Sequence, residues 1–148
     1  MLLVLHAALT WALVGLILTI QVVHYPLFAR VGTAGYAAYQ REHVTRITGL
    51  VAPLMVAELG TGVWLALHPP PALPEASAWL GLALILLIWL STALVQSPLH
   101  GRLSAGFDAA PHARLVTTNT WRTAAWLMRG VLVAWWLVQA LAQGGAPS

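Results

Sequence analysis

Long apolar stretches alternate with short polar ones along the whole of this chain. Four stretches are nearly uncharged and about as long as a membrane-spanning helix, which needs ~20 residues to cross ~30 Å of hydrocarbon. These stretches cover residues 2–23, 47–67, 78–95 and 120–142. The pattern predicts an all-α polytopic membrane protein, a four-transmembrane-helix bundle in which residues 1–148 form one membrane domain.

The basic residues indicate the orientation of this bundle. All seven are arginines, and they fall in or beside two segments, Arg30–Arg46 and Arg102–Arg129. Lys and Arg accumulate in the cytoplasmic connections of membrane proteins. We therefore predict cytoplasmic connections at about residues 24–46 and 96–119. Both termini would then face outward.

Composition narrows the classes of function. The chain is 59% hydrophobic and 7% charged, which excludes an ordinary soluble domain. Its net charge of +3 is explained by arginines beside anionic lipid, and without a lysine-rich patch or recognition motif we expect no nucleic-acid partner. Cysteine is absent, which rules out disulfides and thiolate metal ligands.

Three prolines mark expected breaks in the helices. Pro26 predicts that the first span ends near Tyr25, because proline disfavours helical geometry in the residue before it. Pro53 is expected to bend the second span, and Pro98 to end or kink the third.

Four tryptophans near the outer helix ends are expected to anchor the protein in an aromatic belt: Trp64, Trp79, Trp135 and Trp136.

The two halves of the chain share polar positions at an offset of 76 residues. The matched pairs are His24 with His100, Ala34 with Ala110, His43 with Asn119 and Arg46 with Arg122, and Gln21 matches Gln96 if one gap is allowed. Such a pattern is typical of two parallel two-helix repeats, although chance alignment in an apolar sequence gives the same matches.

A group of polar residues marks the candidate site. Antiparallel spans bring the inner ends of all four helices into one layer, where we expect a single cavity accessible to a membrane-dissolved ligand. The candidate catalytic residues are His24, His43, His100, Asn119 and Arg122, and Gln21 and Gln96 are candidates for substrate binding. The imidazoles would serve acid–base chemistry or bind a metal, and Arg122 would stabilise negative charge. The competing interpretation is that residues in this layer are only solvated or bind lipid phosphate.

Glu58 and Arg129 lie deeper in the predicted spans. They are 12 and 10 residues from Arg46 and Asn119, so they reach similar depth. An unpaired charge there is costly, and we predict an ion pair inside the bundle. On the last span Asn119, Arg122, Trp126 and Arg129 form one stripe that must face protein or a polar cavity. Glu58, Trp126 and Arg129 are therefore further candidates for substrate binding, the alternative being a purely structural pair.

The last third of the chain carries a family resemblance. The segment from Leu115 to Thr123, with Ser97-Pro98-Leu99-His100 before it, looks like small bacterial four-helix membrane proteins of uncharacterised function. It is more distantly similar to the anthrone-oxygenase-like family, whose last helix begins with an Asn-x-x-Arg pattern. The resemblance implies a multi-pass protein of the bacterial inner membrane that oxidises a lipophilic aromatic substrate, with Asn119 and Arg122 as the residues carried over.

Three functions are compatible with these patterns. The first is a membrane-embedded enzyme with redox or oxygenase-type chemistry on a lipophilic small molecule, in which His24, His43 and His100 could hold a metal ion or a haem. The second is a small oligomeric transporter or channel, with Glu58 and Arg129 lining a polar path. The third is a non-catalytic accessory subunit. Glycines in the spans, including Gly15, Gly49, Gly60, Gly62 and Gly81, would allow a homo-oligomer.

Overall fold

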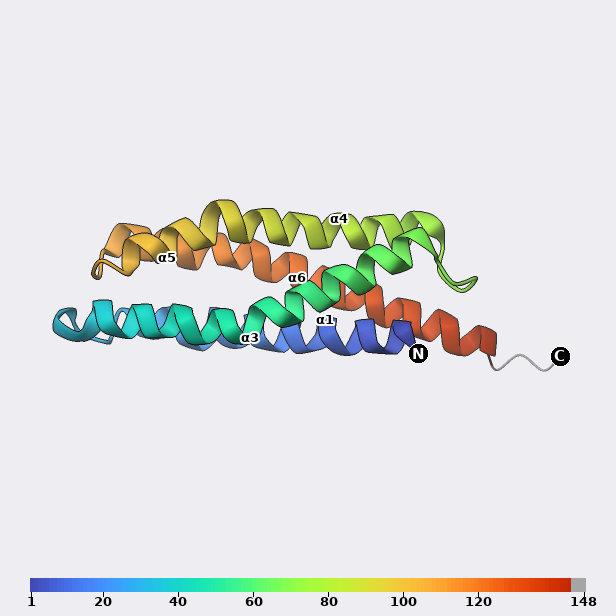
Figure 1. The fold of residues 1–148 in the computed structure, drawn as a ribbon, viewed down its shortest axis with the longest axis horizontal. Helices are drawn as coiled ribbons and strands as arrows, with labels where there is room; N and C mark the ends of the chain where they lie inside the picture. The colour runs from blue at the N-terminus through green and yellow to red at the C-terminus, as the bar shows by residue number, and fades with distance from the viewer. Residues whose placement is uncertain (145–148) are drawn as a thin grey trace.

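The structure, a computed structural model, describes residues 1–144. Four helical segments are long and apolar enough to cross a membrane, and they pack side by side as a bundle (Figure 1). They run from Leu2 to Phe28, Thr33 to Leu67, Glu75 to Leu103 and Ala109 to Gln143. The prediction of an all-α bundle with four membrane-spanning helices is confirmed.

The first and third segments are each divided by a short π-helix. In chain order the elements are α1 (Leu2–Thr19), η1 (Ile20–His24), α2 (Tyr25–Phe28), α3 (Thr33–Leu67), α4 (Glu75–Ser91), η2 (Thr92–Gln96), α5 (Ser97–Leu103) and α6 (Ala109–Gly144). Packing is cyclic, since α1 and α4 each contact both α3 and α6. The N-terminus and the end of α6 lie at one end of the bundle, and the connections after α2 and α5 lie at the other (Figure 1).

The helices continue further than the sequence predicted. We expected Pro26 to end the first helix near Tyr25, but it continues to Phe28, and the third helix passes Pro98 and continues to Leu103. In both places a π-turn comes just before the proline: the N–H of Tyr25 bonds to the carbonyl of Ile20, and that of Ser97 to Thr92. Such a local change of register lets a membrane helix accommodate proline. Most of the expected connections, residues 24–46 and 96–119, are therefore helical.

Helix α3 is bent, as the sequence predicted. Pro53 lies inside it, and Figure 1 shows that α3 changes direction near its middle. Its main neighbours are α1 and α4, while its contact with α5 is slight. The bend therefore leaves a space between the first half of α3 and the third helical segment, which is where the candidate site lies.

The predicted ion pair between Glu58 and Arg129 is present and fully buried. Arg129 Nε lies 3.3 Å from Glu58 Oε1, and the hydroxyl of Thr10 donates to the same oxygen at 2.8 Å. Arg129 Nη2 also donates to His6 Nε2, and His6 Nδ1 lies 2.6 Å from the hydroxyl of Thr61. His6 belongs to this network because it lies one helical turn before Thr10 on α1.

One of the four expected anchor tryptophans has a different role. Trp64, Trp79 and Trp135 are exposed, as an aromatic belt requires, but Trp136 is only 1% exposed. Its ring lies 5.5 Å from the Arg129 guanidinium carbon, in cation–π contact, and its Nε1 donates to Ser77 on α4 at 3.1 Å. The buried network thus connects all four long helices.

Two glycines allow the helices to approach this network closely. A Cβ at Gly81 would lie 2.5 Å from Trp136 Cη2 and 2.7 Å from Arg129 Nη1, and a Cβ at Gly62 would lie 2.5 Å from Ile85 Cδ1. Gly60, two residues before Gly62, meets nothing within 4 Å. Gly62 and Gly81 therefore allow close packing between helices inside the bundle.

We expect Gly81→Ala to destabilise the protein by about 1–3 kcal/mol, because the added methyl group overpacks a rigid, fully buried network. Gly60→Ala is the matched control, and it should leave stability unchanged or raise it by up to about 1 kcal/mol through helix propensity. Thermal unfolding in detergent micelles would compare the two. Equal melting temperatures for both variants would contradict the close approach seen at Gly81.

Candidate functional site

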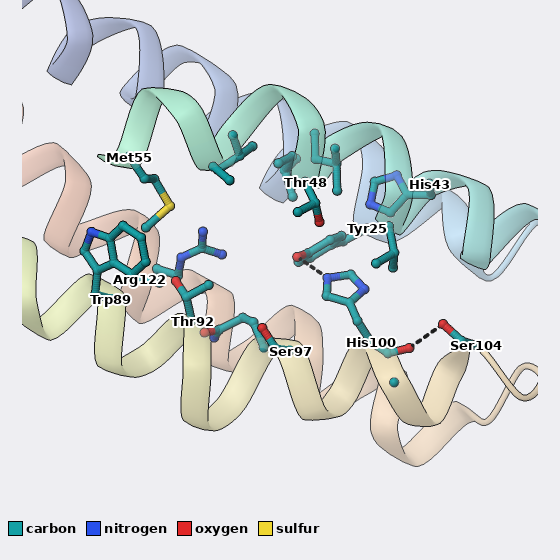
Figure 2. Close-up of a pocket in the computed structure, with 17 residues that line it drawn as sticks. Tyr25, His43, Thr48, Met55, Trp89, Thr92, Ser97, His100, Ser104 and Arg122 are labelled. Carbon is teal, nitrogen blue, oxygen red and sulfur yellow. Dashed lines mark hydrogen bonds between the residues drawn. The ribbon is translucent and has the colours of Figure 1, made fainter. Parts of the chain in front are cut away.

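A cavity of about 330 Å³ lies between the first half of α3 and the third helical segment. Figure 2 shows its lining side chains, which come from every long segment of the bundle. The apolar part of the wall includes Ile20, Ile47, Val51, Met55 and Trp89. The polar part comprises Tyr25, His43, Thr48, Thr92, Gln96, Ser97, His100, Ser104 and Arg122.

Tyr25 and His100 form the central polar contact of this cavity. The Tyr25 hydroxyl lies 2.9 Å from His100 Nε2, and the two side chains face each other in Figure 2. On the other side of the imidazole, Gln40 Nε2 lies 2.8 Å from His100 Nδ1. Gln40 is fully buried. Both ring nitrogens of His100 are thus engaged, so the ring is held in one orientation at the cavity wall.

Either Tyr25 or His100 can be the donor in the hydrogen bond between them. With the proton on Nε2, His100 donates to the Tyr25 oxygen, accepts from the Gln40 amide, and leaves the tyrosine proton free for the cavity. With the proton on Nδ1, a rotated Gln40 amide accepts it through its oxygen, and Tyr25 donates to Nε2. The Gln40 oxygen has no other partner within the described residues. Tyr25 and His100 can therefore exchange a proton with a ligand.

Arg122 reaches the same cavity and is positioned by Asn119. Its Nη1 donates to Asn119 Oδ1 at 3.2 Å, and Asn119 Nδ2 donates in turn to Gln21 Oε1 at 2.7 Å. Gln21 Nε2 donates to the Thr120 hydroxyl at 3.1 Å. This chain ties η1 to α6 and fixes the guanidinium. Asn119 and Gln21 thus lie behind Arg122.

The three candidate histidines form a row. The ring centroids of His24 and His43 are 5.9 Å apart, and those of His43 and His100 are also 5.9 Å apart. His43 lines the cavity described above and also a second one of about 390 Å³, whose wall includes His24, Glu42 and Arg46. In residues 1–144, no three His, Cys, Asp or Glu side chains are placed to hold a metal ion. The expected metal site at His24, His43 and His100 has no support in this geometry.

The structure brings together four of the seven residues expected at one cavity. His43, Gln96, His100 and Arg122 line it. His24 lies at the second cavity instead, and Gln21 and Asn119 lie behind Arg122. The deeper candidates are not on the wall either: Glu58 and Arg129 pair with each other, and Trp126 packs in the apolar core beside Leu13 and Met55.

His112 lies in the first turn of α6. Its Nε2 is 2.7 Å from the carbonyl oxygen of Tyr25. An imidazole N–H there would satisfy a carbonyl in the last turn of the first helical segment, which ends at Phe28. His112 is therefore a support for the helix that carries Tyr25.

Sequence reasoning did not assign Tyr25 or Gln40 to the site. Because Pro26 follows it, Tyr25 is predicted to end a helix, yet the π-turn keeps it inside the helix, which continues to Phe28. Gln40 lies three residues before His43 on the same helix, so one face of α3 carries both, and this spacing was the available signal.

Comparisons of the chain with models of protein families, with curated proteins and with solved structures gave no match in any of the three.

Proposed function

We propose that this protein is a membrane-embedded enzyme that performs acid–base chemistry on a lipophilic small molecule. The observation that carries the proposal is the hydrogen-bonded series Tyr25–His100–Gln40 on the wall of an otherwise largely apolar cavity. Buried polar groups are costly in membrane proteins and usually mark a functional site. A cavity of about 330 Å³ is within the usual range for small-molecule sites.

The proposed chemistry is transfer of a weakly acidic proton from the ligand. Tyr25 contacts the ligand, and His100 takes up or supplies the proton through the tyrosine hydroxyl. Gln40 matches either tautomer of His100, so both protonation patterns keep their hydrogen bonds. His43, whose ring neighbours those of His100 and His24, offers a route for that proton toward the second cavity.

The resemblance to the anthrone-oxygenase-like family supports an oxidative step after proton removal, with dioxygen as the oxidant. For anthrone itself the balance is one dioxygen consumed and one water released for each anthraquinone formed. The residues of this chain contribute proton transfer and orientation to such a reaction. A metal or haem is not part of the proposal, and transport through Glu58 and Arg129 is not favoured, since neither residue lines either cavity described above.

The test is proton exchange on a lipophilic carbonyl compound. Protein in phosphatidylcholine nanodiscs would be incubated with anthrone or 2-tetralone in deuterated buffer without oxygen. We expect deuterium to enter the acidic C–H positions faster than in empty nanodiscs, as measured by mass spectrometry. Admission of oxygen then tests oxidation separately, through anthraquinone formation. Exchange no faster than in empty nanodiscs for both compounds would refute the acid–base proposal.

We also propose that the connections after α2 and α5 face the cytoplasm and that both termini face outward. This orientation is supported by the absence of arginine and lysine from the connection between α3 and α4. Because the chain has no cysteine, a single cysteine can be introduced at an exposed position on each side, Gly35 or Pro71, and labelled specifically. An impermeant maleimide should label Pro71→Cys on intact cells and Gly35→Cys only after lysis. The reverse pattern would overturn the orientation.

A further inference from the structure

Arg122 is a buried cation at the edge of the cavity. Its side chain lies on the cavity wall, with the guanidinium between Met55 and Tyr25 in Figure 2, yet the residue is only 9% exposed. Nη1 donates to the neutral Asn119 amide, and Nε is buried without a hydrogen-bond partner. Arginine keeps its charge in proteins, so this site holds a full positive charge.

No carboxylate side chain of this protein compensates that charge. The chain has four acidic residues. Glu58 pairs with Arg129, and Glu42 pairs with Arg46 at 2.6 Å. Glu75 begins α4 at the opposite end of the bundle, and Asp108 accepts a hydrogen bond from the backbone of Ala110 at the start of α6. Neither ion pair found in residues 1–144 includes Arg122.

Within the described part of the chain, Arg122 differs from Arg129 in having no carboxylate partner for its buried charge. Arg129, seven residues further along the same face of α6, is buried with a carboxylate at 3.3 Å and an imidazole beside it. A buried charge without a partner is strongly destabilising, and membrane proteins rarely retain one without a use. Unlike Arg129, Arg122 borders an open cavity. The missing negative charge can therefore come from a ligand.

The groups near Arg122 favour an acceptor-rich ligand. Trp89 also lines the cavity, and its indole nitrogen lies on the side of the ring away from Arg122 in Figure 2, so the ring adds apolar surface there. The hydroxyl of Tyr25 is free to donate to the cavity when His100 carries its proton on Nε2. The rest of this part of the wall is mainly apolar, with Ile20 and Met55, and the hydroxyl of Thr92 beside Arg122 already donates to the carbonyl of Ile88. A ligand that fits combines an apolar body with an oxygen that accepts hydrogen bonds and carries negative charge.

We propose that the cavity binds a lipophilic oxyanion whose charged oxygen lies against Arg122. This proposal rests on the cavity being the ligand site of the proposed function, and it does not require that catalysis occurs. The oxyanion can be brought in as a carboxylate or lipid phosphodiester, or formed in place from a weakly acidic phenol or enol. All of these share the charged oxygen that Arg122 requires.

The experiment compares a charged probe with a neutral one of the same shape. The binding of 2-naphthoate and of 2-acetylnaphthalene to protein in phosphatidylcholine nanodiscs would be measured by equilibrium dialysis, with empty nanodiscs subtracted. We expect 2-naphthoate to bind about tenfold or more tightly, because hydrogen bonds to a charged group are strong in a desolvated site. Arg122→Met should abolish this preference, and Arg122→Lys should keep part of it.

Controls separate this role from folding and from general attraction of anions. Arg114→Met removes an exposed arginine from the same helix and should leave the preference unchanged. If Arg122→Met does not fold, Arg122→Lys and Arg122→Gln provide the comparison, since only the first keeps the charge. Displacement of 2-naphthoate by added phosphatidylglycerol, and not by more phosphatidylcholine, would identify a lipid as the source of the oxyanion and would support the proposal.

Two results would overturn the inference: equal binding of the two probes to the unaltered protein, or a preference that survives in Arg122→Met. Neither result depends on proton exchange. Protein that prefers 2-naphthoate but fails to catalyse exchange would retain the oxyanion site and lose the enzymatic proposal. Protein that catalyses exchange but binds both probes equally would retain the enzymatic proposal and lose the oxyanion site.

Discussion

Replacement of Glu58 by glutamine is expected to lower the free energy of unfolding by about 3–5 kcal/mol, because it leaves a buried guanidinium without its counter-charge. The side chains of Glu58 and Arg129 are at most 1% exposed, so solvent cannot replace the lost partner. His6 still hydrogen-bonds Arg129 in this variant, but a neutral imidazole supplies no charge. Unfolding in detergent micelles, followed by tryptophan fluorescence, would measure the effect.

The double variant Glu58→Gln/Arg129→Met should be more stable than Glu58→Gln alone, because it removes the uncompensated charge as well. Arg129→Met alone should cost less than Glu58→Gln alone. A buried carboxyl group can take up a proton and become neutral, whereas a guanidinium stays charged. Glu42→Gln is the matched control, since the Glu42–Arg46 pair is exposed and should contribute little. Equal stability of Glu58→Gln and the double variant would contradict a charge-based role for the pair.

The pair itself shows what could be predicted from the sequence. Counting residues from the inner ends of two helices placed Glu58 and Arg129 at the same depth, and the cost of a lone charge then required them to meet. The same helical periodicity placed Asn119, Arg122, Trp126 and Arg129 on one inward-facing stripe, and all four are buried. Charge and periodicity constrain these positions strongly because lipid tolerates few alternatives.

Other parts of the structure depend on interactions that a single sequence does not show. Local rules for proline predicted that the first helix ends near Tyr25, but a π-turn stabilised within the bundle carries it on to Phe28. Trp136 resembled an interfacial anchor, yet Ser77 and Arg129 hold it inside. The candidate cavity was expected where the four inner helix ends meet, whereas it lies to one side because α3 bends and separates from α5.

Replacing Tyr25 with phenylalanine is expected to slow proton exchange on the ligand by about 10²–10⁴-fold, the usual contribution of a positioned acid–base group. The substitution removes only the hydroxyl that contacts His100 at 2.9 Å. The ring remains in its apolar surroundings beside Phe28 and Leu99, so the fold should be kept. Deuterium incorporation into anthrone or 2-tetralone measures the rate. Tyr36→Phe, at a buried tyrosine that lines neither cavity described above, is the matched control and should leave the rate unchanged.

His100→Gln should slow the exchange to a similar degree, because an amide can bond to Tyr25 and Gln40 but cannot carry the proton at neutral pH. The double variant Tyr25→Phe/His100→Gln should be little slower than the slower single variant, since groups that act in one proton transfer are not additive. Binding of 2-naphthoate distinguishes proton transfer by His100 from anion binding by Arg122. The preference for 2-naphthoate over 2-acetylnaphthalene should persist in His100→Gln, where Arg122 is intact. It should be lost only when Arg122 is changed. Rates that multiply in the double variant would mean that Tyr25 and His100 act separately, and the hydrogen bond between them would then not be the path of the proton.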